Sequence, residues 1–386
     1  MKYEGGRISR IDNMVRSAAG CVLLLLLAFT PHHPDTRKAL PKKVELSERL
    51  KPLFARTKQV CFGRYVLEVP QEAKLIWGGT GVSDGGITFI RGGPDASAAR
   101  VASDIDQIKK KSRTAEITYN KEGPVDASWQ LRYFESESAK EFKVHLINTY
   151  VNKGDITFLL RGSVPHGAAE AAGAAKEASL VKNLRLRRDD EIPAEPGYCI
   201  PHGFLADNLY AGQETVNVGI YLPSLPDITF SISSNKDAYG DYPPAEFEAE
   251  KRKELSLLAR INAAKGEQGF SYPSRTVLRE GKRDVQHWYG EESLVKRKDG
   301  THDFEWAFVG TPRDVANPSE YNARMFSKVK HNVVGVADNA SLTDAEALAL
   351  WDKLLSTLKF RVKVPRAPEG SYLMSPSSEA PKPSAQ

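Results

Sequence analysis

The chain has 386 residues, of which 41% are apolar and 27% charged, and its mean hydropathy is −0.42. This composition is typical of a soluble globular protein and excludes a polytopic membrane protein. The length predicts two domains, each large enough to bury a core. The net charge of +5 comes wholly from residues 1–43, where eight Lys and Arg residues face three acidic ones. The remaining chain is formally neutral, so it lacks the clustered positive charge that a nucleic-acid partner requires.

Residues 1–44 are predicted to be an export signal followed by a linker. Basic residues up to Arg16 precede an uncharged run of 13 apolar residues, AAGCVLLLLLAFT. That run has the length of a signal-peptide core and is shorter than the roughly 20 residues of a membrane-spanning helix. Most of the run follows Cys21, whereas a lipid-acceptor cysteine follows its apolar run, so Cys21 is a poor candidate for lipid attachment. We expect export to the periplasm. The alternative is an uncleaved, tilted anchor in the inner membrane, which would be the chain's only membrane contact.

Residues 45–187 are predicted to form an N-terminal α+β domain. CFGRYVLEVP (61–70) alternates in polarity like a half-buried strand. A glycine-rich loop, WGGTGVSDGG (77–86), precedes an amphipathic helix at about 95–111. Four strand-like runs, AEITY, WQLRYFE, FKVHLINTYV and DITFLLR, lead to an alanine-rich helix (168–183) and the short strand LRLR.

Residues 198–364 are predicted to form a C-terminal domain with the same order of elements. Strand-like CIPHGFLA, ETVNVGIYLP and DITFSIS precede a long charged helix at 244–265. Further strand-like runs, RTVLRE, DVQHWYG, DFEWAFV and ARMFSKVKHN, lead to a last helix. Thr343 lies three residues before Glu346 at the start of that helix, which is the spacing of a capping box.

The two predicted domains end alike, which indicates a tandem repeat. VKNLRLR at 181–187 aligns with LSTLKFR at 355–361, so each unit closes with a helix and a short strand. We therefore expect an α+β fold of two tandem similar domains, each an antiparallel sheet covered by two helices. The segment 188–197 has two prolines and no periodicity, and it is the predicted linker. Residues 365–386 have too few apolar residues to pack and are predicted to be disordered.

The sequence contains no catalytic or cofactor motif in the context that its chemistry requires. HExxH, a paired CxxC, an EF-hand loop and the phosphate loop GxxxxGK[ST] are absent. The serine-hydrolase pattern GxSxG matches once, as GVSDG at 81–85, but inside the glycine-rich loop and not at a turn from a strand into a helix. The eight histidines have no metal-ligand spacing. His287 fits an ordinary strand residue, and Glu291 with Glu292 fits a pair of solvated turn charges. We therefore predict no catalytic residues, no cofactor and no metal.

Cys61 and Cys199 open equivalent first strands of the two predicted domains. In an oxidising compartment they can form a disulfide that closes a loop of well over 100 residues, or each can be a separately buried small apolar residue.

Three aromatic residues in loop-like segments, Trp77, Tyr239 and Tyr242, are predicted to contact a partner, because rigid rings bury a large area at little entropy cost. The alternative for each is a ring that packs back on the end of its own sheet.

Several sequence blocks, in order, resemble those of a known family. CFGRYVLEVP, GYCIPHGFL with ETVNVGIYLPSLPDITFSI, REGKRDVQHWYGEES with DFEWAFVG, and SLTDAEALALWDKLLSTLKFR are similar to blocks of the two-domain immunity proteins cognate to lipase effectors of bacterial type VI secretion. The resemblance covers about residues 45–364. Phe62 replaces the small apolar residue that is usual in the first block, and SYPSRTVLREGKR agrees only in part. The resemblance implies a periplasmic antitoxin that clasps a phospholipase and blocks its active-site entrance.

Such a protein needs a binding surface and performs no reaction. Its partner would be the cognate lipase, and we expect the chain to be a monomer. Two linked domains gain effective concentration when both engage the same enzyme. The alternatives are an exported hydrolase with an unrecognised active site and a periplasmic protein that binds a small ligand or the cell envelope.

Overall fold

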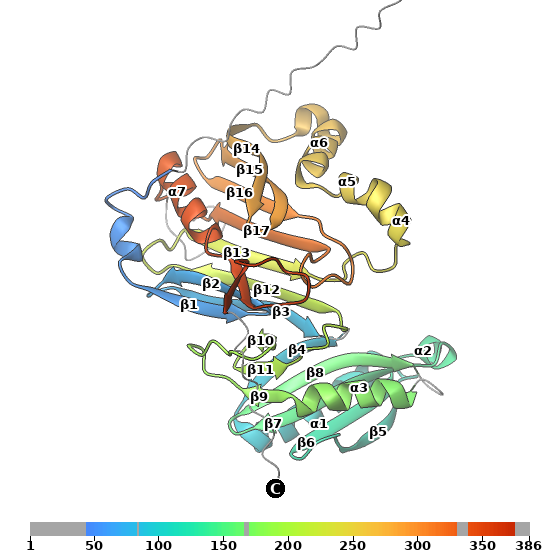
Figure 1. Cartoon of the computed structure of the whole chain (residues 1–386). Coiled ribbons are helices and arrows are strands. Elements are labelled where there is room, and N and C mark those ends of the chain that lie inside the picture. The colour runs from blue at the N-terminus through green and yellow to red at the C-terminus, as the bar shows by residue number, and fades with distance from the viewer. Residues whose placement is uncertain (1–43, 83–84, 166–169, 330–338, 375–386) are drawn as a thin grey trace, which may run out of the picture. The chain divides into compact units, whose positions relative to one another are not determined.

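The computed structural model describes residues 44–82, 85–165, 170–329 and 339–374 as an α+β protein with large antiparallel sheets and few helices (Figure 1). The predicted export segment with Cys21, and residues 375–386 of the predicted tail, lie outside the described residues. Among the described helices, none combines the length and the apolar character that crossing a membrane requires.

A twelve-stranded antiparallel sheet contains strands from both halves of the chain. The first half supplies β3 (Lys74–Val82), β4 (Gly85–Arg91), β5 (Glu116–Glu122), β6 (Ser128–Phe134), β7 (Val144–Lys153) and β8 (Ile156–Pro165). The second half supplies β12 (Glu214–Tyr221), β13 (Ile228–Asn235), β14 (Arg275–Val285), β15 (Trp288–Arg297), β16 (His302–Phe308) and β17 (Glu320–Ser327). The strand order is β14-β15-β16-β17-β13-β12-β3-β4-β8-β7-β6-β5. We expected a separate sheet in each half, but β3 pairs with β12 and the halves share one sheet.

Two smaller sheets bring distant segments together. One contains β1 (Thr57–Phe62), β2 (Tyr65–Pro70), β18 (Lys359–Val362) and β19 (Tyr372–Met374), and the other contains β9 (Leu184–Leu186), β10 (Gly197–Ile200) and β11 (Gly203–Ala206). The run 61–70 is thus a hairpin and not one strand, because Gly63 takes a left-handed φ of +53° at the turn. The prediction of disorder from residue 365 is wrong for β19, which pairs in parallel with β18. Backbone pairing stabilises this segment despite its polar composition.

Helices in the first half pack on both faces of β7 and β8. They are α1 (Gly93–Lys111) and α3 (Glu170–Lys182), with the short α2 (Glu137–Glu141) between them in sequence. The Tyr150 hydroxyl donates to Asp104 of α1 at 2.6 Å, whereas the adjacent Thr149 hydroxyl donates to Glu177 of α3. Because adjacent strand residues point to opposite faces, α1 and α3 cover opposite faces of the sheet.

The predicted helix at 244–265 is interrupted. It consists of α4 (Pro244–Glu246), a π-helical stretch (Phe247–Lys251), α5 (Arg252–Glu254) and α6 (Leu257–Gln268), because Ser256 adopts an extended conformation. The last helix, α7 (Asp344–Leu355), begins with the predicted capping box of Thr343 and Glu346. Two short 3-10 helices lie at η1 (Lys51–Phe54) and η3 (Gly269–Ser271).

The main apolar core is continuous between the two halves. It includes Phe158 of β8, Trp288 of β15 and Trp351 of α7 in one cluster. Tyr65 of β2 stacks on Tyr321 of β17, with ring centroids 4.8 Å apart. The N-terminal hairpin therefore packs against strands of the second half, although it is the first element of the predicted N-terminal domain. We expected a separate core in each half, but the main core contains residues of both, and the first half has only a smaller cluster of its own at Leu131, Tyr150 and Leu159.

Candidate partner-binding groove

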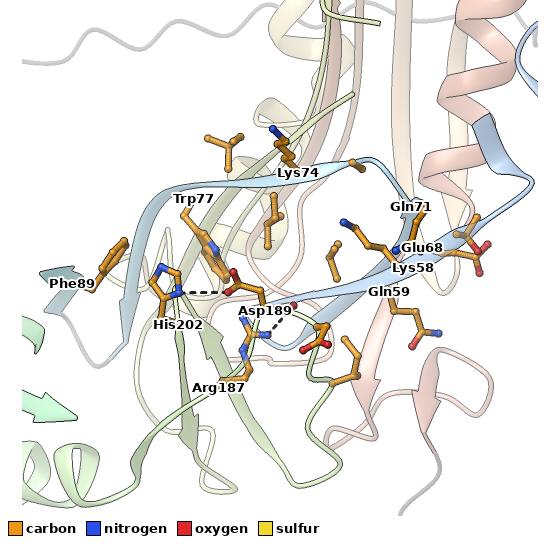
Figure 2. Close-up of a pocket in the computed structure, with 17 residues that line it drawn as sticks. Lys58, Gln59, Glu68, Gln71, Lys74, Trp77, Phe89, Arg187, Asp189 and His202 are labelled. Atoms are coloured by element: carbon orange, nitrogen blue, oxygen red, sulfur yellow. Dashed lines mark hydrogen bonds and ion pairs between the residues drawn. The ribbon is translucent and has the colours of Figure 1, made fainter. Parts of the chain in front are cut away.

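A groove of about 980 Å³ lies between β1 and the first half of β3. Residues 57–60 of β1 form one side, and residues 73–77 form the other. Figure 2 shows these two strands along the groove, with Trp77, Phe89 and His202 near one another at one end. The segment that follows β9, from Arg187 to Ile192, closes the groove from a third side.

The glycine-rich stretch that the sequence predicts as a loop is mostly strand. Gly78 and Gly79 of β3 together lie opposite the single residue Asn217 of β12, which makes a β-bulge. A β-carbon at Gly78 would lie 3.1 Å from the β-carbon of Asn217, so the close approach of the two strands favours glycine. The glycines thus indicate a bulge and a tight strand contact. They place Trp77 inside β3, directly before the bulge.

Trp77 is half-buried and lies between the groove and the junction of the two halves. It lines the groove and packs against a small apolar cluster of Cys61, Cys199 and Phe204. Of the three aromatic residues predicted to contact a partner, Trp77 alone lines this groove. Its position on a paired strand gives it the rigid support that a binding anchor needs.

Tyr239 and Tyr242 lie elsewhere, just before α4. The ring of Tyr239 stacks on that of Phe247 in the π-helical stretch, with centroids 5.5 Å apart, and so packs on a helix and not on the end of a sheet. The Tyr242 side chain stays 42% exposed, with its ring 6.4 Å from that of Tyr239. The structure therefore does not bring these tyrosines together with Trp77.

Buried cationic groups fix the wall that follows β9. The Arg187 guanidinium donates to the carbonyls of Arg188 at 2.9 Å and Glu191 at 3.1 Å, and burial lowers its pKa. Arg361 of β18 donates to the carbonyls of Pro193 and Glu195, and burial lowers its pKa to about 10. Residues 188–196 of the predicted linker have no regular secondary structure, and the last residue, Gly197, begins β10. The two arginines hold the backbone of this segment in place.

His202 is a polar group at the end of the groove. Its Nε2 lies 2.9 Å from a guanidinium nitrogen of Arg91, and its Nδ1 lies 3.5 Å from the Asp189 carboxylate. Because a guanidinium only donates, Nε2 must accept, and the imidazole is then neutral with its proton on Nδ1. Burial lowers the pKa of His202, which agrees with this neutral form. The Nδ1–H of His202 therefore faces the Asp189 carboxylate.

Lys58 and Lys74 are the two lysines of a groove that is also lined by Arg187 and by the carboxylates of Glu68, Asp189 and Asp190. Lys58 lies on β1 and Lys74 on β3, and both line the groove (Figure 2). Within the described part of the chain, neither ammonium group has a carboxylate within ion-pair distance. Their charges are therefore available to an anionic group of a partner.

A disulfide and a buried ion cluster hold the junction behind Trp77. Cys61 and Cys199 are bonded in the structure, with α-carbons 5.9 Å apart, and the neighbouring Gly63 exchanges two backbone hydrogen bonds with Cys199. Arg64 is 3% exposed and donates to Glu214 at 2.6 and 2.8 Å and to Asp207 at 2.5 Å. Burial opposes the charge of Arg64, but the two carboxylates hold its pKa above the ordinary value. The hairpin is thereby fixed to the second half.

The residues considered for catalysis have structural partners. His287 contacts the carbonyl of Ala316 at 2.9 Å. The prediction of a solvated Glu292 is wrong, because its carboxylate is fully buried in a network with Arg279, Arg283 and Asp352. Pairing with two guanidinium groups offsets the cost of burying this charge. Among the described residues, no three His, Cys, Asp or Glu side chains converge as a metal site would require.

Two family models match the chain and define its class. The N-terminal domain of Tle cognate immunity protein 4 matches residues 58–187, and the C-terminal domain of the same protein matches residues 191–363. Together they cover most of the chain in the order of the family. The chain therefore belongs to this family of immunity proteins, and the resemblance found in the sequence is confirmed.

Solved structures with the same fold are immunity proteins of the type VI secretion system (T6SS). The apo structure of immunity protein TplEi of T6SS from Pseudomonas aeruginosa is 25% identical, with a TM-score of 0.62 over 79% of this chain and 97% of that chain. A chain of the Tle4–Tli4 complex is 26% identical, with a TM-score of 0.63 and the same coverage. TplEi complexed with an "L" peptide is 24% identical, with a TM-score of 0.60 over 80% of this chain and 99% of that chain. No curated protein sequence matches the chain.

Proposed function

We propose that the chain is an exported immunity protein that binds a type VI secreted lipase effector and inhibits it by blocking the entrance of its active site. The match of both immunity domains, in order, over residues 58–363 carries this proposal. The likeness to TplEi and to a chain of the Tle4–Tli4 complex supports it. The partner is the cognate lipase, and binding it requires no cofactor, metal or nucleic acid.

The proposed surface that contacts the lipase has one part in each half of the chain. The groove with Trp77 is the contact of the first, and the exposed ring of Tyr242, supported by Tyr239, is that of the second. We propose that residues 45–187 and 198–364 act as two tandem modules of similar build, joined by 188–197, that clasp the enzyme as a monomer. The shared sheet holds the modules at a fixed spacing, so the second contact forms at high effective concentration once the first has formed.

We propose that the chain itself performs no reaction. An inhibitor needs rigid surfaces that exclude substrate from its target, and the buried ion clusters give rigidity without a free nucleophile or base. The volume of the groove is also within the range of small-ligand sites, which is the observation that favours a ligand-binding protein as the second candidate. A small molecule that co-purifies with the chain would support that candidate.

The proposed compartment is the periplasm. Residues 1–44 direct export. The alternative is that the segment stays uncleaved and anchors the protein in the inner membrane. The bond between Cys61 and Cys199 forms after export, because disulfides form and persist in the periplasm and not in the cytosol.

Co-expression tests the function and the compartment together. The cognate lipase, identified as the GxSxG protein encoded beside this chain, is directed to the periplasm of a host that lacks both proteins. We expect the full chain to rescue growth and a chain lacking residues 1–30 to fail. Rescue by neither variant, with both proteins expressed, contradicts the immunity function. Equal rescue by both contradicts the periplasmic assignment alone.

A further inference from the structure

The first half of β3 has an unpaired edge. β4 pairs with β3 only at Gly81 and Val82, and β4 then pairs with β8 from Gly86 to Arg91. On its other side, the stretch Lys74–Trp77 pairs with β12. No strand of the described structure pairs with the outer edge of Lys74–Trp77. Every second residue of that edge therefore directs a backbone N–H and C=O away from the sheet.

The bulge at Gly78 and Gly79 accounts for this edge. A bulge bends its strand and increases the local twist, so the two parts of β3 run in different directions. Only the part beyond the bulge lies beside β4. The part before it is left open next to the groove, and residues 73–77 line that groove consecutively, as an edge does.

The edge has only part of the protection that exposed edges commonly have, namely its short length, the charge of Lys74 and the bulge at Gly78 and Gly79. Natural edge strands are short, carry charges or proline, or are covered by another segment. Here Ile76 is 54% exposed in the middle of the open stretch. Leu75 and Trp77, which alternate with it, are half-buried and line the groove. This edge can therefore accept another strand with apolar side chains on its groove face.

The wall of the groove across from β3 indicates which kind of segment can bind there. β1 is itself the edge strand of its sheet, and its residues 57–60 face the groove. Lys58 on β1 and Lys74 on β3 have no carboxylate partner among the described residues. Glu68, Asp189 and Asp190 also line the groove, but Asp190 pairs with Arg188 and Asp189 faces His202. A row of backbone groups, an apolar wall at Trp77 and two available ammonium groups are complementary to an extended polypeptide that carries acidic side chains.

We propose that an extended acidic segment of the effector adds as a strand to the edge of β3 at Lys74–Trp77. Its backbone pairs with β3, its apolar side chains cover Trp77, and its carboxylates meet Lys58 and Lys74. The inference rests on the proposed immunity function, which it deepens by naming the contact. A small ligand cannot satisfy a row of main-chain donors and acceptors in this way.

Amide hydrogen exchange on the full chain tests the pairing. The probe is the cognate lipase with its catalytic serine replaced by alanine, added to saturation and checked by size-exclusion chromatography. We expect the outward amides of residues 74–77 to exchange at least about tenfold more slowly in the complex. A stable complex without protection at 74–77 overturns the strand addition and leaves the immunity function standing. Failure to form a complex overturns both.

Side-chain variants give an independent readout. We expect Trp77→Ala to weaken binding of the same lipase by about thirtyfold or more, the effect of losing an aromatic anchor. Lys74→Glu places a negative charge beside the acidic segment and is expected to weaken binding. The affinity of this variant for the lipase should also fall less than that of the wild type as the salt concentration rises. Tyr289→Ala, on β15 and 78% exposed outside the groove, is the matched control and should bind like the wild type. Unchanged affinity of both Trp77→Ala and Lys74→Glu, with the fold retained by circular dichroism, overturns the proposal.

Discussion

The bond between Cys61 and Cys199 predicts a large difference in stability between the oxidised and the reduced chain. The two residues are 138 positions apart in sequence. In the chain-entropy model, closing a loop of this length destabilises the unfolded chain by about 5 kcal/mol at 25 °C. The pairing of β3 with β12 also closes a long loop, but only in the folded state. It therefore leaves the entropy of the unfolded chain unchanged and does not reduce the predicted effect.

The perturbation is Cys61→Ala with Cys199→Ala, compared with the oxidised wild type in urea unfolding followed by tryptophan fluorescence. Both sites are buried, at 1% and 0% exposure, and alanine keeps the small apolar volume there. We expect the free energy of unfolding to fall by about 4 to 5 kcal/mol and the m-value to rise, because the unfolded chain is less compact without the bond. The wild type in dithiothreitol is the control and should lose the same amount. A loss below about 1 kcal/mol in both proteins would refute the reasoning.

Three further predictions concern contacts that fix the junction and the last helix. Arg64→Met leaves the buried Glu214 unpaired and should cost about 3 to 5 kcal/mol, most of which adding Glu214→Leu should restore; urea unfolding measures both. Thr343→Ala removes the capping box of α7 and should cost about 1 kcal/mol in the same assay. The hydrogen bond from Arg49 lowers the pKa of Glu346 from 4.5 to about 2. Its stabilisation is therefore complete above about pH 4.5 and is lost as the pH falls through about 2. Glu346→Gln should flatten this part of the acid unfolding curve.

Each of these predictions has an outcome that contradicts it. If adding Glu214→Leu leaves the Arg64→Met loss unchanged, an unpaired carboxylate is not its cause. Full stability of Thr343→Ala would show that other contacts hold the start of α7. An identical acid unfolding curve for Glu346→Gln would show that the pair with Arg49 does not form in solution.

The sequence predicts the elements of this fold better than their pairing. Period-two runs identify most strands, and the Thr343 spacing identifies the start of α7. Whether β3 pairs with a strand of its own half or with β12 depends on which edges the folded chain leaves open, and no local pattern encodes that. The same limit explains why the main core contains residues of both halves. Tyr65 has the pattern of a strand residue whether its ring packs against the first half or against Tyr321.

The candidate site is only partly visible in the sequence. Trp77 is identified as an exposed aromatic residue, but its glycine neighbours indicate a loop until Asn217 is seen opposite them. Arg187 and His202 lie in the predicted strands LRLR and CIPHGFLA, and nothing in either pattern marks them as a wall of the groove. Arg64 looks like the polar side of one strand, whereas the turn at Gly63 carries it into the buried cluster with Glu214. Close contacts between distant segments decide these roles.

A titration of lipase activity with the purified, oxidised chain tests the central claim most directly. The cognate lipase is assayed on phospholipid vesicles at a concentration well above the dissociation constant of the complex. Activity should fall linearly to the background at one equivalent of the chain, and the chain alone should release no fatty acid. Full lipase activity in the presence of excess chain, or hydrolysis by the chain itself, would contradict the account.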